Sequence, residues 1–156
     1  MRVAVLGSWR QEDKKSWRLL DTSEAFRKAC RQVGAELIRR GHSLIVGTDS
    51  EHTADGNAAL GAIEALNAAA TRVESPRIML IRPDSSDEPR RPFLNLRRSN
   101  PGVFIEHQVD AASWAAVKLV QMQLADAAIL IGGAEKTEQA GLTAAVSRKP
   151  ATTASV

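Results

Sequence analysis

Residues Ala127 to Ala145, AAILIGGAEKTEQAGLTAA, decide the fold class of this chain. The apolar run Ala127 to Ile131 ends in Gly132-Gly133, a charged turn follows, and an alanine-rich segment begins near Thr137. This order predicts a buried strand, a glycine turn and the N-terminus of a helix. Such a junction presents backbone N–H groups and the positive end of a helix dipole, which suit an anion such as phosphate. The glycine pair alone fits equally well a turn that needs glycine only for its backbone conformation.

Two earlier apolar runs end at similar turns. Arg2 to Leu6 stops at Gly7-Ser8, and Ser43 to Val46 stops at Gly47-Thr48. The carboxyl ends of parallel strands lie along one edge of a sheet, and ligands bind outside that edge. We therefore expect these two turns and Gly132-Gly133 to border one crevice.

Charged and aromatic side chains lie next to these turns. Trp9 and Arg10 follow the first turn directly, and Lys136 precedes the last helix. An aromatic ring can stack on a base, and a cationic side chain can bind a phosphate, so all three are candidate ligand residues. The alternatives are a partly buried Trp9 that covers the site, and solvated side chains at Arg10 and Lys136.

Helical periodicity separates the predicted strands. The first helix runs from about Ser23 to Arg40, and a second runs from Asp55 to Ala70. The third helix carries apolar residues at Ala116, Leu119, Val120 and Leu124. Cys30 falls on the apolar stripe of the first helix, so we expect it in the core.

The remaining strands are shorter. Arg77 to Ile81 is a third predicted strand, ended by Arg82-Pro83, where Arg82 is a further candidate ligand residue, and Val103 to Ile105 is a short fourth strand. The stretch 83–102 has no apolar periodicity and is predicted to be a long loop. Alternating strands and helices predict an α/β fold, a Rossmann-like three-layer sandwich with a doubly wound, mostly parallel sheet.

The composition restricts the class of partner. The 156 residues, 44% hydrophobic and 25% charged, fit one globular domain. The net charge is +3, and the Lys and Arg residues are spread over helix ends and loops, so a small anionic ligand is favoured over nucleic acid. A single cysteine excludes an internal disulfide, and no metal or cofactor is expected. No apolar run is long enough to span a membrane, and we expect a cytoplasmic protein.

The chain resembles the SLOG superfamily, Rossmann-like proteins that include the LOG phosphoribohydrolases and the DprA proteins. The resemblance is carried by four segments in this order: RVAVLGSW, LIRRGHSLIVG, RIMLIRP and AAILIGGAEKTEQAGLTAAVSRKP. The resemblance extends from Val3 to Pro150. In that family the first turn and the late glycine turn hold the phosphate and ribose of a nucleotide, which implies one SLOG-like nucleotide-binding domain over residues 1–156. Together with the candidates above, the predicted ligand-binding residues are Gly7, Ser8, Trp9, Arg10, Gly47, Thr48, Arg82, Gly132, Gly133, Lys136, Thr137 and Glu138.

The last turn departs from the LOG pattern PGG-x-GT-x-x-E, whose glutamate takes part in cleaving the N-glycosidic bond of a nucleoside monophosphate. Here Ile131 replaces the proline, the turn is one residue longer, Lys136 precedes Thr137 in place of glycine, and Ala140 stands at the position of the glutamate. Without that carboxylate, it is difficult to stabilise an oxocarbenium-like transition state or to activate water. Glu138 is close by, but successive helical positions differ by about 100 degrees.

This combination resembles the SLOG sensor domains of bacterial anti-phage defence systems such as Thoeris, which bind a cyclic ADP-ribose type signal and switch on an attached effector. The resemblance implies a ligand-binding domain with no catalytic residues, acting as a homo-oligomer with an effector in the same chain. The alternative is a LOG-like nucleoside monophosphate phosphoribohydrolase or a nucleoside deoxyribosyltransferase-like hydrolase, in which Glu138, Glu135 or Glu106 supplies the carboxylate. A DprA-like DNA-binding role is disfavoured by the scattered basic charge.

The end of the sequence allows two interpretations. After Lys149-Pro150 the family pattern has another strand, and Ala151 to Val156 follow here. Either the chain is cut from a longer protein with a C-terminal effector, or these last residues themselves form the strand. Alanine-rich stretches at 111–116 and 140–145 would permit close packing between helices of two copies.

Overall fold

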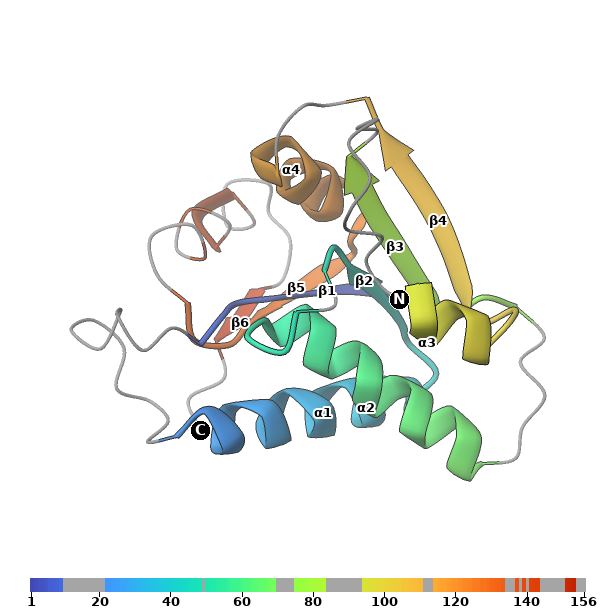
Figure 1. Ribbon diagram of the computed structural model, residues 1–156. Coiled ribbons are helices and arrows are strands. Elements are labelled where there is room, and N and C mark those ends of the chain that lie inside the picture. Colours follow the sequence, from blue (N-terminus) through green and yellow to red (C-terminus); the bar gives the residue numbers. More distant parts are fainter. Residues whose placement is uncertain are drawn as a thin grey trace.

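Strands and helices alternate along the chain, as Figure 1 shows. The computed structural model describes residues 1–9, 22–48, 50–69, 75–83, 94–110, 114–133, 137, 139, 141–143 and 151–153. The strands are β1 (Arg2–Leu6), β2 (Ser43–Val46), β3 (Ile78–Pro83), β4 (Phe104–Val109), β5 (Ala127–Leu130) and β6 (Ala151–Thr153). The helices are α1 (Ser23–Arg39), α2 (Ala54–Ala68), α3 (Leu94–Ser99) and α4 (Trp114–Leu124), and residues 137, 139 and 141–143 are also helical.

The six strands form one parallel sheet in the order β4-β3-β2-β1-β5-β6. The chain runs outward from β1 to β4 and then returns to place β5 on the other side of β1. The strand order therefore reverses between β1 and β5, which is where ligands bind in open α/β sheets. Leu6 lies beside Leu130 in this pair, so the turns that follow the two strands start side by side.

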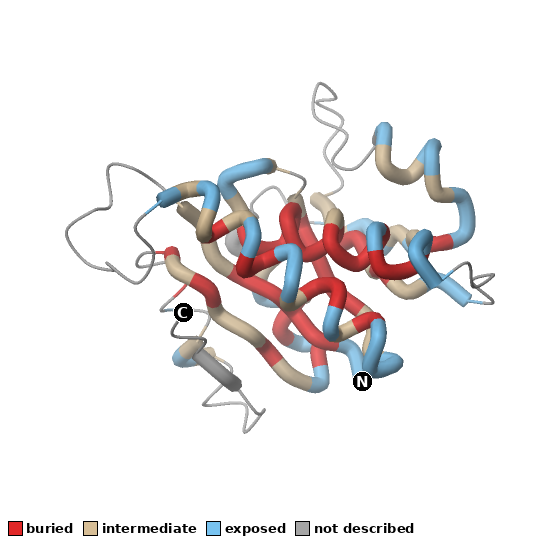
Figure 2. Tube along the Cα trace, turned by 90° about the horizontal axis from the view of Figure 1, so that it is seen from below, coloured by how far each residue is buried: buried red, intermediate tan, exposed pale blue. Residues whose placement is uncertain are grey.

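Helices cover both faces of the sheet. α1 and α2 lie side by side on one face, and α4 lies on the other (Figure 1). Side chains alternate between the two layers: Val5 and Leu44 pack with α1 and α2, whereas Ala4 and Ile45 pack with Val117 of α4. Figure 2 shows the buried residues concentrated along the central strands and the inward sides of the helices. The predicted doubly wound, three-layer sandwich is confirmed.

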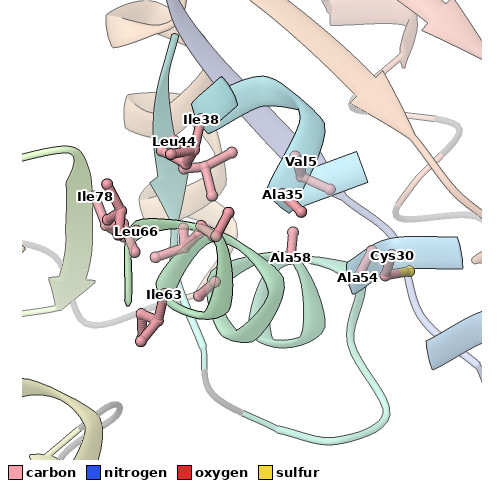
Figure 3. Close-up of a cluster of buried hydrophobic side chains, with 14 of the residues drawn as sticks. Val5, Cys30, Ala35, Ile38, Leu44, Ala54, Ala58, Ile63, Leu66 and Ile78 are labelled. Carbon is pink, nitrogen blue, oxygen red and sulfur yellow. The ribbon is translucent and has the colours of Figure 1, made fainter. Parts of the chain in front are cut away.

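Two glycines allow the backbones of α1 and α2 to touch. A Cβ at Gly34 would lie 1.9 Å from the carbonyl oxygen of Ala58, and a Cβ at Gly61 would lie 1.9 Å from that of Arg31. The weak helix propensity of Gly61 is therefore offset by close packing. Cys30 lies in the same layer, as expected (Figure 3). Burial raises the pKa of its thiol to about 12, and the nearby Asp55 adds to the rise, so the thiol is neutral at physiological pH.

The structure corrects the prediction of one long loop over 83–102. Part of this stretch forms α3, because Leu96 packs against the α1–α2 layer and Arg97 pairs with Glu106 of β4. β3 and β4 also extend further than predicted, to Pro83 and Val109. A helix of only six residues is too short for apolar periodicity to reveal it.

The last described residues form a strand. Ala151–Thr153 forms β6, which pairs in parallel with β5. Across the part of the chain that the structure describes, no helix combines the length and the apolar character that crossing a membrane requires.

Candidate functional site

The ends of β1 and β5 are in backbone contact through Gly7. The φ angle of Gly7 is +144°, and a Cβ there would lie 1.9 Å from the carbonyl oxygen of Ile131. The N–H of Ile131 donates to the carbonyl oxygen of Leu6 at 2.9 Å, which continues the ladder to the end of the strands. Only glycine fits such an approach. The first and last glycine turns therefore meet, as the sequence indicated.

The Gly132-Gly133 turn has left-handed backbone geometry. The φ angles are +59° and +96°, and a Cβ at Gly133 would lie 2.0 Å from Oγ1 of the buried Thr137. Among the described residues, the amide N–H groups of Ser8, Gly132 and Gly133 have no hydrogen-bond acceptor. Consecutive N–H groups in such a turn form a concavity that binds anions. The junction thus offers several backbone donors at the point where the strand order reverses.

Phe26 of α1 packs beside Gly132 of the last turn and Trp9 after the first turn. It is 1% exposed, and its ring lies 3.5 Å from the position that a Cβ of Gly132 would take. The ring centroids of Phe26 and Trp9 are 6.3 Å apart, with their planes tilted by 36°. Trp9 is half-buried, so part of its surface stays exposed. Sequence patterns indicated Phe26 only as a core residue of its helix.

The turn after β1 is held against the N-terminus of α2. The N–H of Trp9 donates to the carbonyl oxygen of His52 at 2.8 Å, and the N–H of Ala54 donates to that of Gly7 at 3.0 Å. Thr53 caps α2 by accepting from the N–H of Gly56 at 3.4 Å. These bonds fix the position of the first turn and use the amide group of Trp9.

The turn after β2 is already occupied by a carboxylate of the protein. The N–H groups of Gly47 and Thr48 donate to Oδ2 of Asp55 at 2.9 and 3.1 Å, and the N–H of Gly56 donates to Oδ1 at 3.1 Å. Burial raises the pKa of Asp55, and these hydrogen bonds oppose the rise. Asp55 therefore takes the place of an external anion at the N-terminus of α2. The amide groups of Gly47 and Thr48 are therefore not available to an external anion.

Gln121 reaches Gly47 from the opposite face of the sheet. This α4 side chain is 1% exposed, and Nε2 lies 2.5 Å from the position that a Cβ of Gly47 would take. Oδ2 of Asp55 lies 3.6 Å from the same position. Nε2 has no hydrogen-bond partner within the described ranges. Sequence patterns did not reveal Asp55 or Gln121 as site residues, because each acts through contacts with another element.

Arg82 lies apart from the glycine turns. Its guanidinium pairs with Glu106 of β4, which also accepts from Arg97 of α3 at 2.8 Å. These ion pairs attach α3 to the sheet. β3 lies two strands from β1, roughly 10 Å away, and Arg82 is engaged on the side of β4. Four residues that the sequence analysis singled out, Arg10, Lys136, Glu138 and Ala140, lie outside the described residues, as does Glu135.

Comparison with known proteins identifies the fold. No protein-family model and no curated protein matches this chain. The crystal structure of TM1055, a target of the Northeast Structural Genomics Consortium, is similar with a TM-score of 0.63 and 19% sequence identity, over 96% of this chain and 71% of that chain. The fold is Rossmann-like.

In a Rossmann-like sheet the binding crevice lies at the reversal of strand order. Here that place is occupied by Gly7, Ser8 and the Gly132-Gly133 turn, with Thr137 against Gly133. The Rossmann-like arrangement therefore brings together part of the predicted ligand set and separates Arg82 from it.

Proposed function

We propose that this chain is a SLOG-like domain that binds a nucleotide-derived signal, of the cyclic ADP-ribose type, between the ends of β1 and β5. The observation that carries the proposal is the set of amide N–H groups at Ser8, Gly132 and Gly133, which have no acceptor among the described residues. A phosphate or diphosphate is the ligand group that such converging donors suit best. The proposal includes a role as a sensor in anti-phage defence, as a homo-oligomer with an effector in the same chain.

Several side chains complete this binding mode. The hydroxyl of Thr137, beside Gly133, donates to a phosphate oxygen. Arg10 and Lys136, which follow the two turns in the sequence, would add positive charge beside the phosphate. The half-buried ring of Trp9, supported by Phe26, offers a surface for a base or a ribose.

Two carboxylates among the described residues are already engaged with groups of the protein, which favours ligand binding without hydrolysis. Glu106, a candidate for a hydrolytic role, is held by Arg82 and Arg97. Asp55 is buried and accepts from three backbone N–H groups. A general acid or base must be within hydrogen-bonding reach of the reacting atoms, and Glu106 is engaged in ion pairs on β4, three strands away from β1. Ala140 replaces the LOG glutamate in the sequence.

Titration calorimetry with AMP, ADP-ribose, cyclic ADP-ribose and cyclic dinucleotides tests the proposal. We expect at least one of these nucleotides to bind with one site per chain and to be recovered intact by chromatography after incubation. Failure of every nucleotide to bind would overturn the proposal. Release of free base from AMP would establish the hydrolase alternative instead.

A matched pair of variants tests the phosphate site. Thr137→Val keeps the shape packed against Gly133 but removes the hydroxyl, and a lost hydrogen bond to a charged group is worth about 1.5–3 kcal/mol, so affinity should fall roughly 10- to 100-fold. Thr143→Val is the control, because that hydroxyl donates to the carbonyl oxygen of Gln139 within the same helical segment. Equal nucleotide affinity of the two variants would exclude Thr137 from the site.

A further inference from the structure

Gln121 is a buried amide that the phosphate site does not explain. It is 1% exposed, and Nε2 has no acceptor in the part of the chain that the structure describes. Most buried polar atoms in proteins have a partner, and an unpaired donor reduces stability. An apolar side chain of the same length in α4 would avoid that loss. A ligand group that accepts from Nε2 would account for a glutamine at this position.

The amide lies at the edge of the proposed crevice. Nε2 is 2.5 Å from the position that a Cβ of Gly47 would take, so glycine is what leaves room for it. Gly47 follows β2, and β2 neighbours β1, which Gly7 follows. The distance from the β1–β5 junction to the end of β2 is one to two strand spacings, roughly 5–10 Å. A ribose attached to a phosphate at the junction extends over such a distance.

The groups around Gln121 favour a ligand group that can both accept and donate a hydrogen bond. Oδ2 of Asp55 lies 3.6 Å from the same Cβ position, so a donor and a carboxylate face one small volume. Asp55 accepts from three backbone N–H groups, and the Thr53 hydroxyl also lies close to it but donates its proton to the carbonyl oxygen of Ser50 at 2.8 Å. A carboxylate has about four acceptor sites, so one is left. A phosphate oxygen only accepts hydrogen bonds and is repelled by the carboxylate. A hydroxyl can accept from Gln121 and donate to Asp55.

We propose, building on the nucleotide-binding function above, that Gln121 donates a hydrogen bond to a ribose hydroxyl of the ligand while Asp55 accepts one from the same hydroxyl. The pair thereby selects ribonucleotides over deoxyribonucleotides. Gln121 is a specificity residue at the sugar, separate from the backbone donors that hold the phosphate.

Calorimetry with ribose and deoxyribose forms of one nucleotide tests this assignment. The probes are AMP or ADP-ribose, whichever binds, and the 2′-deoxy and 3′-deoxy counterparts. We expect the wild-type protein to prefer the ribose form over one deoxy form by about tenfold or more, because a site with buried hydrogen-bonding groups rejects a ligand that leaves them unpaired. Gln121→Met should bind that deoxy form as the wild type does and lose the preference.

Gln123→Met provides the control, because Gln123 is exposed on the same helix. This variant should keep the ribose preference. A preference that survives in Gln121→Met would overturn the inference while leaving nucleotide binding intact. If the wild type binds neither AMP nor ADP-ribose, the ribose assignment fails. The phosphate site fails only if cyclic ADP-ribose and the cyclic dinucleotides do not bind either.

Thermal unfolding supplies a second measurement that does not depend on the sugar. Removing a donor without a partner should leave the Tm of the free Gln121→Met protein equal to or above that of the wild type. The rise in Tm on adding the ribonucleotide should be smaller for the variant, because weaker binding stabilises the folded state less. A lower Tm of the free variant would show a structural role for the amide and overturn the proposal.

Discussion

Asp55 is subject to two opposing effects. Burial favours the neutral carboxyl and raises its pKa, whereas hydrogen bonds from Gly47, Thr48 and Gly56 favour the charged form. Burial is the larger effect, so the folded protein binds this proton more tightly than the unfolded chain does. The stability that protonation contributes is fully present below the unfolded pKa, about 4, and is lost as pH rises through the folded pKa. Above the folded pKa, the buried charged form of Asp55 is held at a cost in stability.

Asp55→Asn should therefore change the pH dependence of unfolding. The Asn side chain accepts fewer hydrogen bonds than the carboxylate, which lowers stability at every pH. Because Asn does not titrate, only the wild type should lose stability as pH rises from about 4 to 7. The unfolding free energy of the variant should therefore increase relative to that of the wild type over this range. Urea unfolding across this range measures the difference. A difference that stays constant or moves in the opposite direction would contradict the raised pKa.

Asp126→Asn is a control in which the unfolding free energy should change with pH in the opposite direction. Asp126 is exposed and accepts from the backbone N–H of Arg2 at 2.7 Å, and this bond holds the pKa of its carboxyl below the usual range. Its contribution is present above the unfolded pKa and is lost as pH falls through the folded pKa. The Asp126→Asn protein should therefore lose stability relative to the wild type as pH rises from the folded pKa to the unfolded pKa, about 4, and the difference should stay constant at higher pH.

At the level of elements, the contact between α1 and α2 depends on glycine. Backbone atoms of each helix occupy the space where the other helix would carry a Cβ, at Gly34 and at Gly61. Propensity alone favours alanine over glycine in a helix by about 1 kcal/mol. Packing requires the reverse at these two positions, because any Cβ would push the helices apart.

Gly34→Ala and Gly61→Ala should each destabilise the protein by more than about 2 kcal/mol despite their better propensity, since overpacking displaces the backbone. Urea unfolding measures this loss. Glu64→Ala in α2 removes only an exposed ion pair with Arg31, 3.5 Å long, and should cost below about 1 kcal/mol. A more stable Gly34→Ala protein would show that the helices can separate at little cost.

For the whole molecule, the sheet order places the most buried strands at the centre. Val3, Ala4, Val5 and Leu6 of β1 are at most 3% exposed, whereas Ile105 of the edge strand β4 is 48% exposed. The turns of the proposed phosphate site are attached to these central strands. The rigid centre of the fold thus positions the backbone donors, while the edge strands carry less of the core.

Protection against native-state hydrogen exchange should decrease from the central strands to the edge strands. Amide groups bonded between β1, β2 and β5 should exchange only through global unfolding, with protection close to the full unfolding free energy, because opening them disrupts both core layers. Those of β4 and β6 should exchange faster, through local opening at the edges. Equal protection in β4 and β1 would contradict this distribution of stability.

The sequence predicted most of the elements. β1 and β2 have the predicted bounds, and α1 and α2 agree to within one or two residues. α3 was missed because it is held by Leu96 and Arg97, whose contacts lie on other elements. The meeting of the Gly7 and Gly132 turns was also predicted, since parallel strands bring their carboxyl ends to one edge.

Local patterns alone therefore determined the alternation of strands and helices, the glycine turns and the Rossmann-like class, because periodicity and backbone conformation depend on near neighbours in the chain. Tertiary structure decided which polar groups are left for a ligand. Asp55 takes the amide groups of Gly47 and Thr48, and Glu106 takes Arg82, whereas Gln121 finds no acceptor among the described residues. These outcomes depend on partners from other elements, and only the folded arrangement of those elements brings such groups within hydrogen-bonding distance.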